Sequence, residues 1–252
     1  MTVSQSKRGL MYIAFGQQYD LLAAHAVRYS RRLTNLPVRV ITNLRKRSPV
    51  WDEIPDVLFT EVDAEQFENR HFKTTAFEYS RFDETLLLDC DSVIQAEGVE
   101  KIFDAAGDED LLLNCLTTWK VGDRIPRIYA ETMKRFGFTL PFKVFNGAFI
   151  LFKKTPQASA FFYLWHDYWK SSGAGRDMPS MNMALQICDA TVKETSLSDG
   201  FFAPDYPHPE CIVQHCYNGA GDKDFHADFG LPRIQECKPF DVRKDDWELV
   251  DL

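Results

Sequence analysis

Short apolar runs alternate with segments of helical periodicity along the first half of the chain. The apolar runs, which predict strands, lie at residues 10–15, 38–42, 57–62 and 85–88. Two segments between these runs, residues 20–33 and 64–82, have apolar residues at helical spacing. In the second segment these residues are Phe67, Phe72, Ala76 and Tyr79. The predicted strands are continuously apolar rather than alternating, which is typical of a parallel sheet covered by helices on both faces.

The second half continues the same alternation. It predicts strands at 111–115, 145–152 and 211–214, and helices at 125–136, 158–170 and 181–188. The helix at 158–170 is rich in aromatic side chains at helical spacing, which indicates core packing rather than a sugar-stacking surface. No change of composition divides the chain, so we expect one α/β domain over residues 1–252 with a mostly parallel central sheet flanked by helices.

Composition and charge exclude several classes of function. The 252 residues carry a formal net charge of −8, whereas a nucleic-acid-binding surface needs a basic face. Residues 1–9 are polar and basic and no apolar stretch reaches the length of a membrane span, so we expect a cytoplasmic protein without one. The six cysteines lack CxxC spacing, which indicates neither a zinc site nor a disulfide framework.

The sharpest local feature is the sequence Leu-Leu-Leu-Asp-Cys-Asp-Ser at residues 86–92. Asp89 and Asp91 follow a buried strand directly, at the sheet edge where open α/β sheets bind ligands. Residues i and i+2 of an extended segment point the same way, so both carboxylates can converge on one hard cation such as Mn²⁺ or Mg²⁺. The alternative is that both are ordinary turn residues at a strand end.

Four segments in order resemble the retaining, A-type-fold glycosyltransferases of the glycogenin and lipopolysaccharide galactosyltransferase family. Residues 73–94 resemble the donor-binding core of that family, and the Phe-Asn-Gly sequence beginning at Phe145 resembles its second signature. Asp177 and Asn182 match a third motif, although Met178 stands where the family has glutamine. The fourth match begins at His215 and has longer spacing than the family pattern.

This resemblance implies a role for each matched residue. It implies that Asp89, Asp91 and His215 bind a divalent metal ion. Lys73 and Lys223 are the candidates to contact the diphosphate of the sugar donor. Asn146 and Asp177 would face the donor sugar as catalytic or sugar-contacting groups. The other donor-binding residues that we expect are Phe15, Gly16, Tyr19, Lys73, Arg81, Cys90, Gly147, Gly219 and Lys223.

Several of these residues have a second, structural interpretation. Tyr19 can stack on a nucleotide base or pack on the core at a helix start, and Arg81 can support the diphosphate or pair with a neighbouring carboxylate. Asn146 can be a turn residue and Asp177 a helix N-terminal residue. Trp119 follows a strand in a polar stretch and is a candidate for the acceptor site.

The sequence therefore predicts a glycosyltransferase that uses Mn²⁺ or Mg²⁺. It would move a sugar from a UDP- or GDP-sugar to a carbohydrate or other hydroxyl acceptor, with retention implied by the resemblance. Residues 10–95 would form the nucleotide-binding half, 96–230 the sugar- and acceptor-binding half and 231–252 a C-terminal tail. A non-catalytic nucleotide-sugar-binding relative is the main alternative, and a sugar-nucleotide pyrophosphorylase is a weaker one, because the loop at Gly16 lacks a glycine-rich, basic character.

Overall fold

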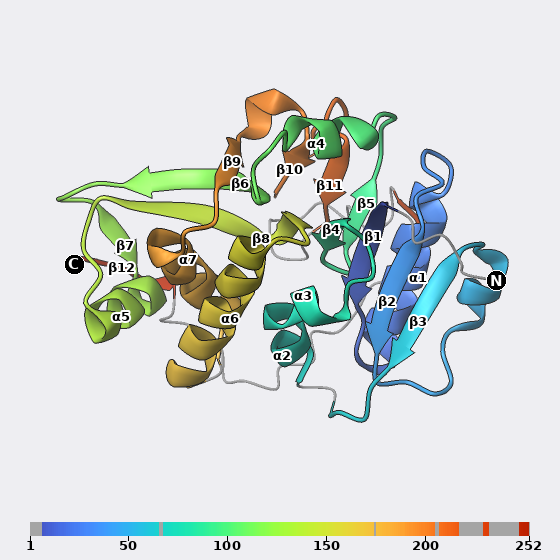
Figure 1. Cartoon of the computed structure of the whole chain (residues 1–252), viewed down its shortest axis with the longest axis horizontal. Coiled ribbons are helices and arrows are strands. Elements are labelled where there is room, and N and C mark those ends of the chain that lie inside the picture. Colours follow the sequence, from blue (N-terminus) through green and yellow to red (C-terminus); the bar gives the residue numbers. More distant parts are fainter. Residues whose placement is uncertain are drawn as a thin grey trace.

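A seven-stranded sheet forms the centre of the computed structural model (Figure 1). The structure describes residues 7–65, 68–173, 175–204, 207–216, 229–231 and 247–251. The sheet order is β3 (Val57–Glu61), β2 (Val38–Thr42), β1 (Arg8–Ile13), β4 (Glu84–Leu88), β8 (Phe142–Lys153), β6 (Leu111–Trp119) and β9 (Val192–Thr195). β8 runs antiparallel to both its neighbours, whereas the other pairings are parallel. The prediction of a mostly parallel sheet is confirmed, and strands from both halves of the chain share it.

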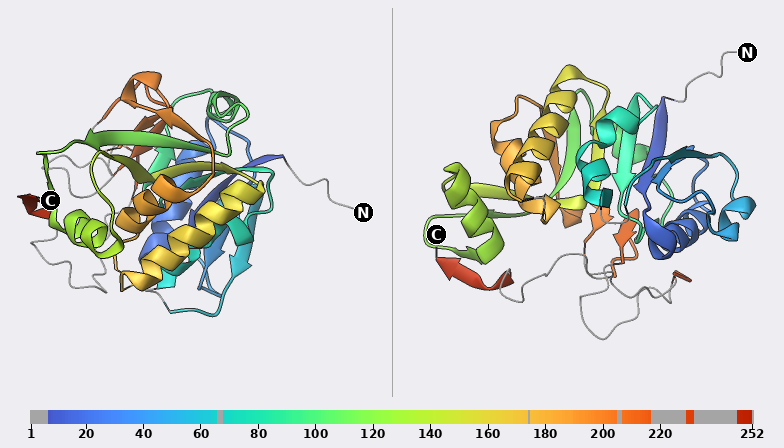
Figure 2. Two further views of the ribbon diagram at one scale, coloured as in Figure 1. Left: turned by 60° about the vertical axis from the view of Figure 1, so that its left-hand side comes forward. Right: turned by 90° about the horizontal axis from the view of Figure 1, so that it is seen from below.

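Successive side chains of the central strands enter two different apolar cores, one on each face. Leu10 and Tyr12 of β1 pack with α1 (Gly16–Ser30) and α4 (Glu100–Ala105). Met11 of β1 and Leu87 of β4 pack on the other face. That face is covered by α2 (Asn69–Thr74), α3 (Ala76–Tyr79), α6 (Pro156–Ser171) and α7 (Asp177–Ile187). Figure 2 shows these helices on the two sides of the sheet, which explains why its strands are continuously apolar.

The aromatic helix α6 belongs to the core, as its spacing predicts. Phe161 and Trp165 are fully buried, and their rings stack with centroids 5.7 Å apart. Phe162 packs beside them against Phe152 of β8, with ring centroids 4.8 Å apart. These side chains therefore stabilise the sheet and are not a platform for carbohydrate.

Two smaller sheets extend the central one. β5 (Ser92–Ile94) pairs antiparallel with β11 (Val213–His215), which pairs parallel with β10 (Phe202–Ala203). β7 (Arg124–Pro126) pairs with β12 (Leu249–Asp251) beside α5 (Arg127–Phe136). The described residues also include the 3-10 helices η1 (Pro49–Glu53) and η3 (Leu197–Asp199).

Two local expectations change in the structure. The single helix expected at 64–82 is divided into α2 and α3 at Thr75. Residues 125 and 126, expected to begin a helix, instead belong to β7, because residues 249–251 pair with this strand. Trp119, the acceptor-site candidate, ends β6, and its ring packs against Tyr129 and Phe142 with centroid distances of 4.8 and 6.2 Å.

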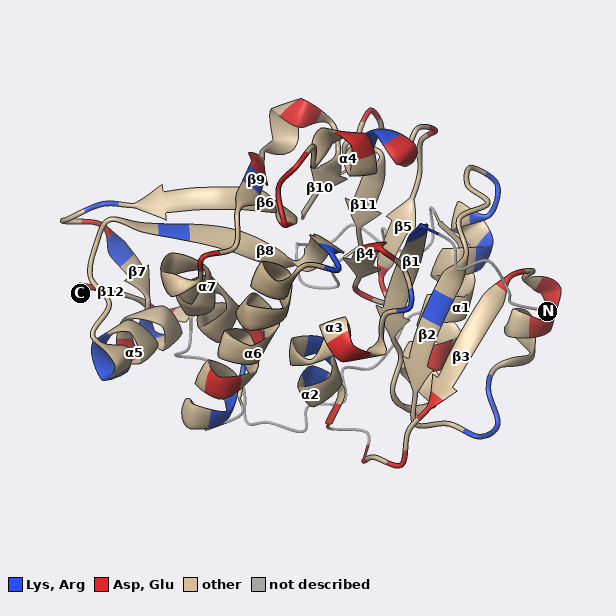
Figure 3. Cartoon of the chain, in the orientation of Figure 1, with Lys and Arg blue, Asp and Glu red and all other residues tan. Residues whose placement is uncertain are grey.

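Charged side chains of both signs are interspersed over the elements (Figure 3). Among the described residues, no helix is both long and apolar enough to cross a membrane.

Candidate functional site

The two carboxylates of the Asp-x-Asp sequence lie at the C-terminal edge of the central sheet. Asp89 directly follows β4, and its backbone N–H donates to the carbonyl of Ala148 in β8 at 3.2 Å. A tight turn follows, in which the N–H of Ser92 donates to the carbonyl of Asp89 at 2.9 Å. This turn joins β4 to β5 and holds Asp91 between two strands, at the edge where the sequence predicts a ligand site.

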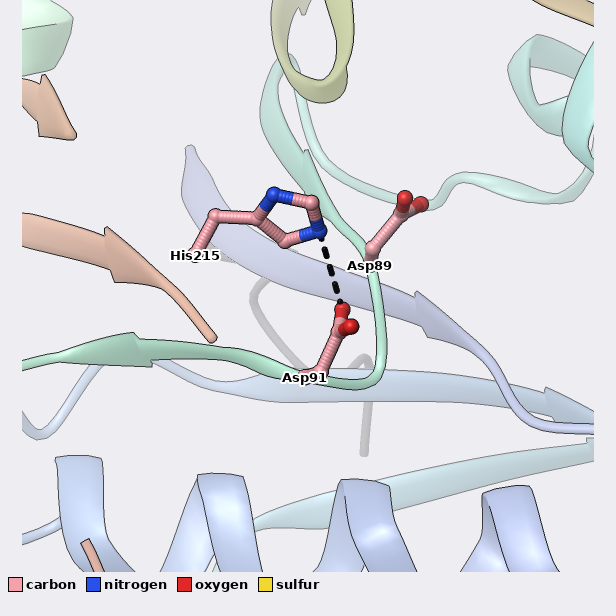
Figure 4. A group of neighbouring side chains, drawn as sticks. All are labelled: Asp89, Asp91 and His215. Carbon is pink, nitrogen blue, oxygen red and sulfur yellow. Dashed lines mark ion pairs between the residues drawn. The ribbon is translucent and has the colours of Figure 1, made fainter. Parts of the chain in front are cut away.

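Strand pairing brings His215 to these carboxylates from far along the chain. β11 pairs with β5 so that His215 lies opposite Ser92, and the N–H of Cys216 donates to the carbonyl of Asp91 at 2.8 Å. The ligand atoms of Asp89, Asp91 and His215 all lie within 4.8 Å of one another. Figure 4 shows the Asp91 carboxylate directed at the His215 ring, where Nε2 is 3.2 Å from Oδ1.

A second charged group adjoins the first. The Nζ atom of Lys73 on α2 lies 2.6 Å from Asp89 Oδ1 and 3.5 Å from Asp177 Oδ2. Arg70, one turn earlier on α2, places Nε 3.5 Å from Asp177 Oδ1. Lys73 therefore connects the Asp-x-Asp turn to the first residue of α7.

These contacts shift the acidities of the site in different directions. Burial raises the pKa of Asp89, and the charge of Asp91 adds to this, although Lys73 and His215 oppose it. Burial alone would lower the pKa of His215, but the Asp91 carboxylate raises it to about 9. Burial alone would raise the pKa of Asp177, but Lys73 and Arg70 hold it below its ordinary value. Asp91 and Asp177 are thus each compensated by positive side chains.

Asn146 and Gly147 lie next to this group, on an irregular stretch of β8. Asn146 is buried, and its Oδ1 accepts from the N–H of Ala148 at 2.7 Å, as a turn-forming asparagine does. A Cβ atom placed on Gly147 would lie 3.9 Å from Lys73 Nζ and 3.8 Å from Met178 Cγ. Gly147 therefore lies beside Lys73 of α2 and Met178 of α7.

Asn182 fixes α7 against this part of β8. Its Oδ1 accepts from the N–H of Phe145 at 2.6 Å, and its Nδ2 donates to the carbonyls of Phe145 and Met178 at 3.2 and 2.9 Å. The side chain is completely buried. Asn182 thereby sets the position of Asp177, one and a half turns earlier on the same helix.

The loop after β1 is short and enters α1 at Gly16. Gly16 has a φ of 77° and donates its N–H to Asn43 Oδ1 at 2.8 Å. Phe15 is buried, with its ring centroid 5.0 Å from that of Phe72. Tyr19 is partly buried against the core on the face of the sheet that α1 and α4 cover. Cys90 is buried as well, and its thiol donates to the carbonyl of Ile13 at 3.2 Å. Burial raises the pKa of that thiol well above its ordinary value.

Of the expected donor-binding residues that the structure describes, Arg81 is not brought to this group. Arg81 precedes β4, whereas Asp89 follows it, so the two lie at opposite ends of the strand. Gly219 and Lys223 lie outside the described residues. Arg70, by contrast, is at the site and was not singled out from the sequence, although its i, i+3 spacing from Lys73 places both on one face of α2.

The ligand atoms of Asp89, Asp91 and His215 suit a divalent cation. Two carboxylates and one imidazole, held within 4.8 Å, can supply three ligands and leave positions for other oxygens. A first-row divalent cation takes such ligands at about 2.0–2.3 Å. Asp89, Asp91 and His215 are therefore the residues that would hold it.

Comparison with solved structures identifies the fold. The chain is similar to an active-site mutant of LgtC, with a TM-score of 0.59 and 12% identity over 90% of this chain and 98% of that one. It is also similar to galactosyltransferase LgtC in complex with donor and acceptor sugar analogs, with a TM-score of 0.57 and 12% identity over 90% of this chain and 98% of that one. Mouse xyloside xylosyltransferase 1 gives a TM-score of 0.56 and 9% identity over 86% of this chain and 99% of that one. The chain therefore has the A-type glycosyltransferase fold.

Comparison of the sequence itself identifies no relative. No family model matches the chain, and no curated protein matches it. At 9–12% identity, the similarity to these solved structures is one of fold, and the activity of this chain has to be argued from its site.

Proposed function

We propose that this protein is a metal-dependent glycosyltransferase that uses a nucleotide-diphosphate sugar and a hydroxyl acceptor. The observation that carries the proposal is the convergence of Asp89, Asp91 and His215 at the C-terminal edge of a sheet with the A-type fold. A random pair of strand-end carboxylates has no reason to meet a histidine from another strand some 120 residues later. Mn²⁺ or Mg²⁺ is the cation that we propose.

Cleavage of a sugar–phosphate bond develops negative charge on the departing diphosphate. The cation would neutralise this charge as a Lewis acid, bound to Asp89, Asp91 and His215. Lys73 supports the same task, because its ammonium group lies 2.6 Å from Asp89 and is largely buried. We propose that it also contacts the diphosphate.

Lys73 lies between Asp89 and Asp177, and we assign Asp177 and Asn146 to the donor sugar. The lowered pKa of Asp177 keeps its carboxylate ionised, so it can accept hydrogen bonds from sugar hydroxyls or stabilise positive charge at the anomeric carbon. Retention of the anomeric configuration is part of the proposal. Met178, beside Asp177, has no polar or ionisable group, whereas the family that the chain resembles has glutamine there. We therefore place Asp177 at the reacting face.

A thermal-shift series with UDP, GDP and their sugar conjugates, with and without Mn²⁺, tests donor binding. A ligand at about 100 times its Kd adds about 2.7 kcal/mol to the free energy of unfolding. We expect one nucleotide to raise Tm only when Mn²⁺ is present, and EDTA to reverse the shift.

Donor hydrolysis by the same samples separates an enzyme from a binding protein. Release of free sugar that depends on Mn²⁺ would support transfer chemistry. Mn²⁺-dependent binding without hydrolysis or transfer to any hydroxyl acceptor would indicate a non-catalytic nucleotide-sugar-binding protein. Absence of both binding and turnover would contradict the proposal.

A further inference from the structure

We propose that Lys73 acts as an internal counter-ion that competes with the cation for Asp89, so that the metal ion binds tightly only when a nucleotide diphosphate draws Lys73 away. This inference rests on the function proposed above. It assigns to Lys73 a second role besides contact with the diphosphate: it couples metal binding to nucleotide binding.

The first observation is the position of the ammonium group. Lys73 Nζ lies 2.6 Å from Asp89 Oδ1 but 3.5 Å from the nearest oxygen of Asp177, so Asp89 is its principal partner. Figure 4 shows the Asp89 carboxylate turned away from the pair formed by Asp91 and His215. One of the three metal ligands is thus held by a lysine rather than aligned with the other two.

The second observation is that the contact is shielded from solvent. The Lys73 side chain is 15% exposed and that of Asp89 is 35% exposed. Coulomb interactions between charges a few ångströms apart are several times stronger at such positions than in bulk water. An ammonium group at Asp89 therefore both neutralises the carboxylate and repels a divalent cation that approaches it.

The third observation concerns where Lys73 can go. Asp177 is a second carboxylate partner of Lys73, at 3.5 Å, and it pairs with Arg70 at 3.5 Å through its other oxygen, so Lys73 lies between two carboxylates. Gly147 lies on the same side, where a Cβ atom would be 3.9 Å from Lys73 Nζ. A diphosphate bound beside Lys73 would supply the negative oxygens that Lys73 needs in exchange for Asp89.

Linkage then follows from the shared residue. If the nucleotide releases Asp89 for the cation, then by thermodynamic necessity the cation also strengthens nucleotide binding by the same factor. Part of that factor comes from direct contact between cation and diphosphate. The remaining part is the contribution of Lys73, and a substitution at this position measures it.

The test is a titration of Mn²⁺ by electron paramagnetic resonance of the free ion, without nucleotide and with saturating UDP or GDP. Lys73→Met should tighten the binding of Mn²⁺ alone by about tenfold. The coupling factor is the ratio of the Mn²⁺ dissociation constants without and with nucleotide, and such factors are typically about 5–150-fold. Lys73→Met should reduce this factor by at least about fivefold. Lys73→Gln provides the same measurement if the methionine variant does not fold.

Lys134→Met is the control for charge. It removes one positive charge from an exposed position on α5, so the affinity for Mn²⁺ alone should change by less than about twofold. Asp91→Asn identifies the site, because it should abolish the tight binding in every background.

The outcomes separate this inference from the proposed function. Mn²⁺ affinity that is unchanged or weaker in Lys73→Met and Lys73→Gln, with the site still dependent on Asp91, would overturn the counter-ion role and leave the metal site standing. An equal increase in Lys134→Met would also overturn it, because the effect would then come from overall charge. No Mn²⁺ binding by any variant, with or without nucleotide, would overturn both.

Discussion

Asp91 lies at the centre of the candidate metal site. Its carbonyl accepts from the N–H of Cys216, just after β11, and its carboxylate is paired with the ring of His215. We expect Asp91→Asn to lower turnover by more than about a hundredfold, because stabilisation of charge on a leaving group contributes several kcal/mol. The fold should survive, since Asp91 lies in a turn beyond the end of β4. Initial rates with saturating donor and Mn²⁺ measure the effect.

A thermal melt of the Asp91→Asn protein provides the control for folding. His215→Ala should show the same loss of turnover, because it removes another ligand of the same cation. Full turnover in a folded Asp91→Asn protein would contradict the metal site.

Asp177 presents a different question at the residue scale, because a helix N-terminal carboxylate has a structural role of its own. Asp177→Asn keeps the shape of the side chain in the first turn of α7 but removes the charge that Lys73 and Arg70 compensate. We expect kcat to fall more than about fiftyfold while donor affinity changes only slightly, because the charge matters mainly in the transition state. A small loss of stability with normal kcat would instead indicate a purely structural carboxylate.

At the scale of elements, Asp110 connects three of them at the edge of the sheet. Its carboxylate accepts from the N–H and hydroxyl of Thr191, before β9, at 2.8 and 2.9 Å, and from the hydroxyl of Thr155, before α6, at 2.6 Å. Burial alone would raise the pKa of Asp110, but these bonds lower it below the ordinary value of 3.8. A lowered pKa means that the folded state favours the charged form.

Asp110→Asn should therefore lower the free energy of unfolding by about 1.5–3 kcal/mol at neutral pH, since it disrupts hydrogen bonds to a charged group. The stabilisation by Asp110 is complete above its unfolded pKa and is lost as the pH falls through its lower folded pKa. Urea titrations should thus show a constant difference from pH 5 to 8 that shrinks below about pH 4. Asp108→Asn, at an exposed position, should change stability by less than about 0.5 kcal/mol. A difference that is independent of pH would contradict this account.

Local patterns predicted the elements better than their ends and interruptions. The strand at 38–42 has the expected bounds, and its neighbours are within a few residues of theirs, because continuous apolar runs identify buried strands. The break between α2 and α3 was missed, since the hydroxyls of Thr74 and Thr75 both donate to the carbonyl of His71. Such bonds compete with the helical pattern and leave apolar spacing unchanged. β7 was missed because its partner, residues 249–251, is distant in sequence.

For the whole molecule, the site could be predicted only where resemblance or strand position indicated it. The position of Asp89 and Asp91 followed from the strand before them, whereas the meeting with His215 depended on a pairing between β5 and β11 that no local pattern shows. The contact between Lys73 and Asp89 depends on how α2 packs on the sheet, and Arg70 reaches Asp177 for the same reason. Residue types predict which groups are able to react, but the long-range packing decides which of them meet.

The small sheet of β5 and β11 has a consequence for local motion. One proposed metal ligand, His215, is held in place by a strand of three residues, so the proposed ligand set is only as ordered as that pairing. A cation bound to both sides would hold β11 against β5 and suppress its local opening. Hydrogen–deuterium exchange should therefore slow at the amides of residues 213–216 when Mn²⁺ and nucleotide are added, with exchange in β1 and β2 unchanged. Equal protection in Asp91→Asn would show that the cation does not hold the two strands together.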